Sequence, residues 1–279
     1  NASTPIAGMM HETKKFYGVQ FHPEVTHTKQ GFAILKKFVT KICDCKSSWT
    51  MPNYIETAVK HIQETVKDDE VILGLSGGVD SSVSAYLLKQ QGYDVKALFM
   101  QNWQSEPGEI CTSEIDFKDA SEVCDKLGIP LHRANFSDEY WERVFTNFLS
   151  EHEKGRTPNP DILCNREIKF KSFLEYAFKI GADFIATGHY AKIIDKDGAK
   201  FLSRAKDAFK DQTYFLHEVN ETEFNKCIFP LADLNKNEVR DIALREGLIT
   251  ADKKDSVGIC FVGERNLKDF LNRFIDFSK

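Results

Sequence analysis

Residues 71–83 read VILGLSGGVDSSV, and this stretch decides the fold of the chain. Its first five residues form an apolar run typical of a buried strand, and apolar residues from Val83 onward recur at helical spacing. Between them, glycines let backbone N–H groups approach an anion, and a helix N-terminus adds unpaired donors and a favourable dipole. The stretch therefore predicts a phosphate-binding loop rather than a strand–turn–helix without a ligand. It is not the G-x-x-x-x-G-K-S/T loop, because no lysine follows the glycines.

Strand and helix patterns alternate after this loop. Strands are predicted over residues 94–100, 131–136 and 183–188, and helices over 115–127, 137–149 and 162–180. This alternation predicts an α/β fold with a parallel sheet and helices on both faces. Ligands of such sheets bind at the carboxyl ends of the strands. The loop after Leu75, the segment at Met100 and the turn at Gly188 should therefore converge.

The composition is that of an ordinary globular protein, with 42% hydrophobic and 28% charged residues among 279. A net charge of −5 argues against a generally basic nucleic-acid-binding surface but permits a local basic patch. Seven irregularly spaced cysteines do not form a secreted disulfide framework, and none has zinc-ligand spacing. No apolar run approaches the roughly 20 residues of a membrane span. We expect a cytoplasmic protein without a membrane partner or a bound zinc, whose chain starts within a longer protein.

The order SGGVDS at residues 76–81 resembles the PP-loop of ATP pyrophosphatases. Enzymes of that family cleave ATP between its α- and β-phosphates and leave AMP on an acceptor oxygen. The resemblance implies ATP and Mg²⁺ as cofactors, with Asp80, the loop's only carboxylate, as the partner of Mg²⁺. The implied ATP-binding residues are Gly74, Leu75, Ser76, Gly77, Gly78, Val79, Asp80 and Ser81, with Met100 and Gly188 at the adenine end.

Five further stretches resemble the tRNA-specific 2-thiouridylases, which replace O2 of the wobble uridine by sulfur. They are LFMQNW (98–103), GRTPNPDILCN (155–165), ATGHY (186–190), KDQTYF (210–215) and KDSVGICFVGER (254–265). The resemblance runs from about residue 70 to the end of the chain. In that family a further portion follows, including a β-barrel that helps to hold the tRNA, so we expect a truncated chain.

The residues of these stretches suit sulfur transfer. A carbonyl oxygen of a pyrimidine is a poor leaving group, and adenylation makes AMP the leaving group instead. A thiolate or persulfide can then attack C2. Cys164 and Cys260 lie in polar, Gly- or Pro-bearing segments, where we expect exposure; a small buried hydrophobe is the alternative for each. By the resemblance, Cys260 carries the persulfide, Cys164 releases the sulfur and forms a disulfide with Cys260, and Asp161 is the general acid/base.

The same resemblance implies which residues contact tRNA. They are Asn159, Pro160, Asp161, His189, Lys210, Asp211 and Gln212. A sulfur-relay protein that donates the persulfide is the implied second partner. The alternative for His189 is a structural role, as a hydrogen-bonded histidine in a loop. Between residues 154 and 171 bases outnumber acids, which fits phosphate contact or a solvated helix face. Cys111, Cys124 and Cys227 are interpreted as structural.

The N-terminal part resembles another family. Residues 16–28, FYGVQFHPEVTHT, are similar to the closing strand and turn of class I glutamine amidotransferases, specifically GMP synthetases, and this likeness extends through about residue 83. In that family, residues at the positions of His22 and Glu24 complete a Cys-His-Glu triad. The part that would carry the nucleophilic cysteine is absent, so no glutaminase activity is expected. Helices are predicted over residues 30–42 and from Pro52 to Val66.

These patterns predict four segments and one leading function. The segments are an amidotransferase-like piece (1–48), a helical linker (49–69), an ATP-binding domain (70–220) and the start of a tRNA-contacting domain (221–279). The leading function is tRNA 2-thiouridylation. The first alternative is a GMP synthetase that adenylates xanthosine monophosphate for attack by ammonia, which offers no role for Cys164 and Cys260. The second is a non-catalytic fusion that only binds ATP.

Overall fold

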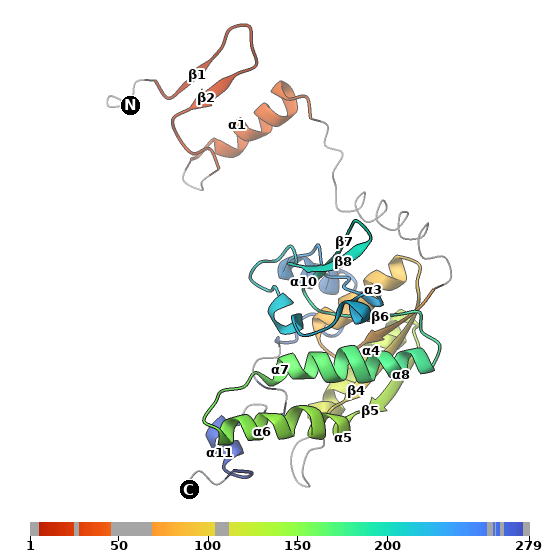
Figure 1. Cartoon of the computed structure of the whole chain (residues 1–279). Helices are drawn as coiled ribbons and strands as arrows, with labels where there is room; N and C mark the ends of the chain where they lie inside the picture. The colour runs from red at the N-terminus through yellow and green to blue at the C-terminus, as the bar shows by residue number, and fades with distance from the viewer. Residues whose placement is uncertain are drawn as a thin grey trace. The chain divides into compact units, whose positions relative to one another are not determined.

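The computed structural model describes residues 6–24, 28–45, 69–103, 112–255, 259, 261–262 and 265–275. The chain divides into two compact units, residues 1–58 (unit 1) and 59–279 (unit 2) (Figure 1). The division that we predicted at residue 220 stays a prediction. Among the described residues, no helix combines the length and the apolar character needed to cross a bilayer.

Unit 1 contains a small hairpin and one helix. Strands β1 (Gly8–Met10) and β2 (Tyr17–Val19) pair antiparallel. Helix α1 (Gly31–Lys37) continues as the π-helical turn η1 (Phe38–Ile42), which confirms the helix predicted over residues 30–42. The second predicted helix, from Pro52 to Val66, lies outside the described residues.

Unit 2 is built on a five-stranded parallel sheet in the order β5-β4-β3-β6-β9. Its strands are β3 (Glu70–Gly74), β4 (Asp94–Gln101), β5 (Leu131–Asn135), β6 (Phe184–Thr187) and β9 (Cys227–Ile228). The predicted α/β fold with a parallel sheet is confirmed. The two-residue edge strand β9 was not predicted, because so short a run has no readable alternation.

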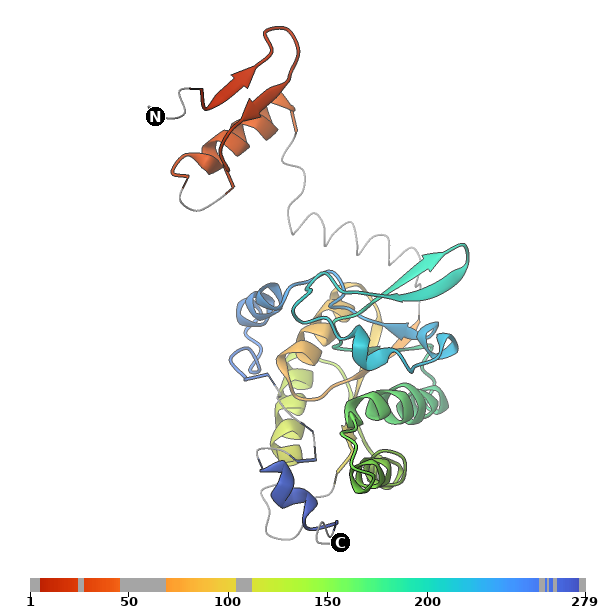
Figure 2. The same cartoon turned by 60° about the vertical axis from the view of Figure 1, so that its left-hand side comes forward.

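Alternate residues of β3 belong to the two hydrophobic cores that cover the sheet. Val71 and Leu73 lie in one core with residues of α3 (Val79–Gln90), α4 (Thr112–Leu127) and α10 (Lys236–Arg245). Ile72 lies in the other core. Because successive strand residues point to opposite faces, helices cover both sides of the sheet (Figure 2).

The second core is formed mainly by two long helical segments. The first comprises α5 (Ser137–Tyr140), η2 (Trp141–Phe145) and α6 (Thr146–Glu153). The second comprises α7 (Pro160–Leu163), η3 (Cys164–Ser172) and α8 (Phe173–Lys179). The remaining elements are the hairpin β7 (Lys192–Lys196) and β8 (Ala199–Ser203), the short helices η4 (Thr213–Leu216) and α9 (Glu221–Phe224), and α11 (Leu267–Leu271).

Candidate active site

The loop between β3 and α3 has the features of an anion site. Gly78 is the N-cap of α3 and has an extended backbone. Since glycine has no side chain, it accepts no capping hydrogen bond from the N–H groups of the first helical turn. The hydroxyls of Ser81 and Ser82 instead donate to the Gly78 carbonyl, at 3.1 and 2.7 Å. Ser76 is exposed. The N–H groups at the start of a twelve-residue helix therefore face a loop that offers them no side-chain acceptor, which suits a phosphate.

Three glycines allow neighbouring segments to approach this loop or the strand before it. A Cβ on Gly188, just after β6, would lie 2.9 Å from the Ser81 nitrogen. Gly77 has φ +74°, and a Cβ there would lie 2.3 Å from the carbonyl oxygen of Asp116 in α4. A Cβ on Gly74 would lie 3.2 Å from Cε of Met100. The predicted convergence of the loop, Met100 and Gly188 is thus confirmed; nucleotide binding by them stays a prediction.

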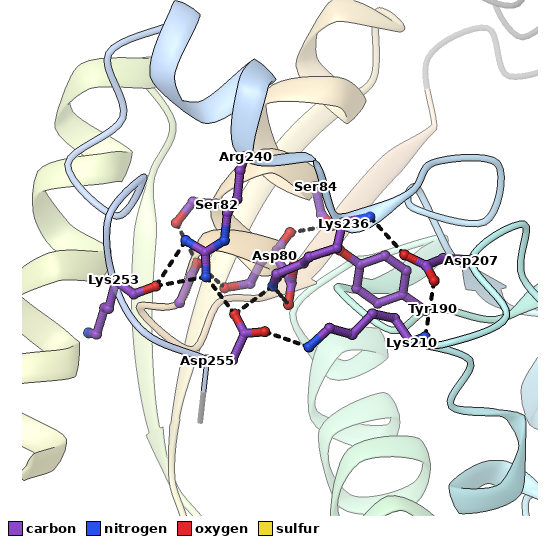
Figure 3. A network of polar contacts seen from close by, with 12 residues as sticks. Asp80, Ser82, Ser84, Tyr190, Asp207, Lys210, Lys236, Arg240, Lys253 and Asp255 are labelled. Carbon is purple, nitrogen blue, oxygen red and sulfur yellow. Dashed lines mark hydrogen bonds and ion pairs between the residues drawn. The ribbon is translucent and has the colours of Figure 1, made fainter. Parts of the chain in front are cut away.

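Asp80, the second residue of α3, is held by two side chains. Lys236, the first residue of α10, places its Nζ 2.8 Å from both carboxylate oxygens of Asp80 (Figure 3). Tyr190 donates its hydroxyl to Oδ1 at 2.8 Å. Burial, followed by the charge of Asp80, raises the pKa of Tyr190, so this hydroxyl remains a neutral donor. The loop's only carboxylate therefore has a fixed orientation.

Lys236 also reaches Asp255, at 2.8 Å, and its side chain is only 11% exposed. Lys210 and Arg240 approach the same carboxylate at 2.6 and 2.9 Å. Burial opposes ionisation of Asp255, but the hydrogen bonds from Lys210 and Lys236 outweigh it and lower the pKa of Asp255 to about 2. A network of three cations and two carboxylates thus joins the phosphate loop to the segment before Cys260.

Lys236, Tyr190 and Asp255 are not among the site residues predicted from the sequence. Tyr190 and Asp255 lie within the motifs ATGHY and KDSVGICFVGER, close to predicted site residues. Lys236 had one signal: it follows Asn235, whose side chain and that of Glu238 form a capping box at the start of α10. The capping box predicts a helix start, but only the fold shows that this start faces Asp80.

Asp161 and Cys164 share one helical segment. Asn159 caps α7, its Oδ1 accepting from the Asp161 N–H at 3.1 Å, and Pro160 occupies the first turn. Burial raises the pKa of Asp161, against the opposing charge of Lys169. The exposure expected for Cys164 is wrong: the residue is 7% exposed and belongs to a hydrophobic core. Cys164 lies within the helix predicted over residues 162–180, and the apolar face of that helix carries the thiol inward.

Two further cysteines of unit 2 are buried, and two lie outside the part that the structure describes. Cys124 and Cys227 are buried, which raises the pKa of Cys124 to about 12 and also raises that of Cys227, in agreement with a structural role. Cys111 and Cys260 lie outside the described residues. Phe261, next to Cys260 in sequence, is 1% exposed and lies in the same core as Cys164.

The residues predicted to contact tRNA make contacts within the chain. His189 is buried, and its Nδ1 lies 2.8 Å from the hydroxyl of Thr187. Burial, followed by the charge of Lys169, lowers the pKa of His189 well below its ordinary value. Asp211 accepts from the Ala205 N–H at 2.9 Å, and Gln212 accepts from the Tyr190 N–H at 2.9 Å. Contact of these residues with tRNA stays a prediction.

In unit 1, the predicted His22 and Glu24 lie together. Their Nδ1 and Oε1 atoms are 2.7 Å apart, and both side chains are mostly exposed. The backbone N–H of Glu24, then its hydrogen bond with His22, lowers the pKa of Glu24.

Comparison with known families gives one match for each unit. The family described as "tRNA methyl transferase HUP domain" matches residues 69–264, and the class I glutamine amidotransferase family matches residues 1–42. The second match agrees with the amidotransferase resemblance; its narrower assignment to GMP synthetases stays a prediction.

Curated relatives match about three quarters of the chain. The chain is 56% identical over 210 residues to a protein from Alkaliphilus oremlandii named tRNA-specific 2-thiouridylase MnmA, covering 75% of this chain and 58% of that protein. It is 58% identical over 207 residues to the protein of the same name from Legionella pneumophila, covering 74% and 57%. This chain therefore spans little more than half the length of the curated relatives it matches.

Solved structures with a similar fold share little sequence with this chain. The U34-tRNA thiolase NcsA from Methanococcus maripaludis is 20% identical, with a TM-score of 0.48, over 76% of this chain and 69% of that one. The NH3-dependent NAD synthetase from Campylobacter jejuni is 18% identical, with a TM-score of 0.45, over 75% and 80%.

Proposed function

We propose that this chain, which belongs to the family of the tRNA methyl transferase HUP domain, is an ATP-dependent tRNA 2-thiouridylase. The observation that carries the proposal is the phosphate loop. It follows the central strand β3, opens onto uncapped N–H groups of α3, and has Asp80 and Lys236 beside it. Such a site suits the triphosphate of ATP. The curated relatives are named tRNA-specific 2-thiouridylase, which supports tRNA as the acceptor of the AMP group.

In the first half of the proposed reaction, O2 of a tRNA uridine attacks the α-phosphorus of ATP. The bond between the α-phosphorus and its bridging oxygen breaks, and pyrophosphate leaves. Residues 76–81 would hold the phosphates through backbone N–H groups, and Lys236 would offset the negative charge that develops on them. Met100 and Gly188, at the ends of β4 and β6, would border the nucleoside.

The site also fits Mg²⁺, through one carboxylate. Asp80 presents two oxygens, the ligand type that Mg²⁺ prefers, and it lies next to the proposed phosphate site. Bound Mg²⁺ would neutralise phosphate charge. Both oxygens of Asp80 are engaged by Lys236, so this lysine must release at least one of them. Within the described residues, no group of three or more His, Cys, Asp or Glu is arranged around a metal.

In the second half, the terminal sulfur of a Cys260 persulfide attacks C2 and AMP departs with the former O2. Cys164 thiolate then attacks the Sγ of Cys260, breaking the bond to the transferred sulfur. The products are 2-thiouridine and a Cys164–Cys260 disulfide, which an external thiol must reduce. Asp161 would serve as the acid/base, since its raised pKa suits a group that gains and loses a proton. Cys164 must leave its buried position for this step.

Two partners and a location complete the proposal. tRNA is the substrate, contacted through residues 159–161, His189 and residues 210–212, and a sulfur-relay protein loads the persulfide on Cys260. The reducing cytoplasm is the compartment in which such thiols persist.

The proposal is tested by measuring pyrophosphate release and 2-thiouridine formation with tRNA, ATP and a small-molecule persulfide, which transfers its outer sulfur to Cys260 and leaves as a thiol. Asp80→Ala should reduce pyrophosphate release at least a hundredfold, because it removes the carboxylate beside the phosphates. Asp241→Ala, which alters an exposed acid on α10, should leave the rate unchanged. Normal pyrophosphate release by the Asp80 variant would rule out this role for the loop.

The amidotransferase match at residues 1–42 favours one alternative, a GMP synthetase. That activity would convert xanthosine monophosphate, ATP and ammonium to GMP. Formation of GMP by the full chain, without formation of 2-thiouridine, would replace the proposed function by this one.

A further inference from the structure

The hairpin β7–β8 connects two stretches that are predicted to contact tRNA. It leaves the sheet after His189 and Tyr190 and returns at Lys210. Its base is closed by the backbone, where the Gln212 N–H donates to the Tyr190 carbonyl at 2.8 Å. Tyr190 in turn donates to Asp80 of the phosphate loop at 2.8 Å. The base of the hairpin therefore lies next to the proposed ATP site.

The charge of this segment is opposite to that of the whole chain. Residues 192–210 contain six basic and three acidic residues, a net +3, whereas the chain carries −5. Some of these cations are paired, as Lys192 is with Asp233. Lys196 and Arg204 are exposed and form no ion pair within the part of the chain that the structure describes. Unpaired cations on an acidic protein favour an anionic partner.

The two faces of the hairpin differ in burial. Ile193 and Leu202 pair across the strands and pack against the hydrophobic core. The adjacent pair, Ile194 and Phe201, points the other way and is 39% and 50% exposed. Lys196 lies two residues from Ile194, so its side chain shares the outward face. An aromatic ring thus lies beside an unpaired lysine on a face that the described chain leaves uncovered.

A second exposed ring lies just after the hairpin. Phe209 is fully exposed, yet its turn is fixed, because Asp207 accepts from the N–H groups of Phe209 and Lys210 at 3.0 and 3.2 Å. Asp207 also accepts from the Lys236 N–H at 2.9 Å, which attaches this turn to α10. Because the backbone of this turn is already ordered, stacking a planar partner on the ring costs side-chain entropy only.

We propose that the outward face of β7–β8, with the Phe209 turn, binds unpaired nucleotides of the tRNA substrate. Lys196 on this face and the exposed Arg204, just after the end of β8, contact phosphates, and Phe201 and Phe209 stack on bases. Single-stranded RNA is bound in this way, by aromatic side chains interleaved with cations. The inference rests on the proposed function and adds a surface outside the stretches already assigned to tRNA. Figure 2 shows the hairpin projecting from unit 2.

The test measures binding of a fluorescein-labelled anticodon stem-loop RNA to the full chain by anisotropy. Lys196→Glu combined with Phe201→Ser should weaken binding roughly tenfold or more, and the slope of log affinity against log salt should fall by about one. The control is Lys36→Glu with Phe32→Ser on α1, which removes an exposed ring and changes the net charge equally. The control should bind RNA as the unmodified chain does. Matching thermal unfolding curves verify that the variants are folded.

Three outcomes overturn the proposal. In the first, the hairpin variant has unchanged RNA affinity. In the second, the control variant loses as much RNA affinity as the hairpin variant. In the third, the hairpin variant keeps its RNA affinity but loses association of the chain with a second copy of itself. 2-Thiouridine formation is measured in parallel on intact tRNA. If the unmodified chain thiolates tRNA while the hairpin variant binds RNA normally, only the hairpin proposal fails. If the unmodified chain releases no pyrophosphate with tRNA, the proposed function fails instead.

Discussion

Lys236 is the residue on which the geometry of the candidate site depends most. A buried ammonium is stable only with partners, and here Asp80 and Asp255 supply them from two different segments. The same ammonium would have to exchange Asp80 for phosphate oxygens if Mg²⁺ took the carboxylate. Sequence patterns do not predict such a residue, because they report the face of an element and not what lies opposite.

The pH dependence of stability should report the Asp255 interactions. A folded-state pKa of about 2, below the ordinary 3.8, stabilises the fold above about pH 4, and this contribution is lost as the pH falls toward 2. Asp255→Asn should therefore cost about 1–3 kcal/mol near neutral pH. The difference from the unmodified chain should shrink as the pH falls from 5 to 3. Urea unfolding at several pH values measures it, and a constant difference would contradict the assignment.

His189 should produce a dependence at higher pH. Its folded-state pKa lies well below the ordinary 6.5. Below about pH 6.5 the unfolded chain therefore binds a proton at this residue that the folded chain does not, and the free energy of unfolding falls with the pH. The unmodified chain should lose up to about 1.4 kcal/mol per pH unit there from this residue. His189→Asn keeps a group that can bond to Thr187 and should reduce the loss. Thermal midpoints at pH 7.5 and 5.5 compare the two proteins; equal shifts would count against a buried neutral imidazole.

At the scale of elements, the sequence predicts what periodicity controls. The order of strands and helices from β3 to β6 and the loop after β3 follow from patterns within short windows, and the convergence of Gly188 with that loop follows from the rule that ligand sites lie at the carboxyl ends of parallel strands. The burial of Cys164 does not. Its polar, proline-containing neighbours suggest exposure, whereas the helix that starts after Asn159 carries the thiol on its inner face.

The contact between the loop and the end of β6 should be sensitive to a single methyl group. In Gly188→Ala, the new Cβ would lie 2.9 Å from the Ser81 nitrogen, and a clash with backbone costs about 1–3 kcal/mol. In Gly78→Ala, the nearest atom is the Ser76 hydroxyl at 3.5 Å, an ordinary contact. Urea unfolding should therefore separate the two variants clearly. Equal stabilities would show that the two segments are not in close contact.

The helix that carries Cys164 should shield its thiol. Without substrates, an alkylating reagent should modify the exposed Cys43 and Cys45 quickly and Cys164, Cys124 and Cys227 slowly. Addition of ATP and tRNA should accelerate modification of Cys164 alone among the buried thiols, because the proposed reaction needs its thiolate. Mass spectrometry of the labelled peptides measures each rate.

After mild oxidation, Cys164 and Cys260 should be protected from the alkylating reagent together, and protection of neither would argue against the proposed disulfide.

At the scale of the whole molecule, the two units differ in how their apolar residues are placed. Unit 2 has two hydrophobic cores, one on each face of its sheet. In unit 1, Gly31 is the only buried residue among those that the structure describes. Met9, Phe16 and Phe32 are 67%, 67% and 80% exposed. A two-stranded hairpin and one short helix without a core are only marginally stable in water.

This difference predicts how the two units behave when they are separated. A fragment of residues 59–279 should keep the thermal midpoint of the full chain and should carry out the proposed tRNA-dependent pyrophosphate release as the full chain does, because both cores and the loop after β3 lie within it. A fragment of residues 1–58 should show no cooperative unfolding, since it buries too little apolar surface to offset the entropy of ordering its chain. Circular dichroism melting of both fragments measures this. A sharp transition in the shorter fragment would mean that residues outside the described part complete a core there. It would support an amidotransferase-like module that folds independently.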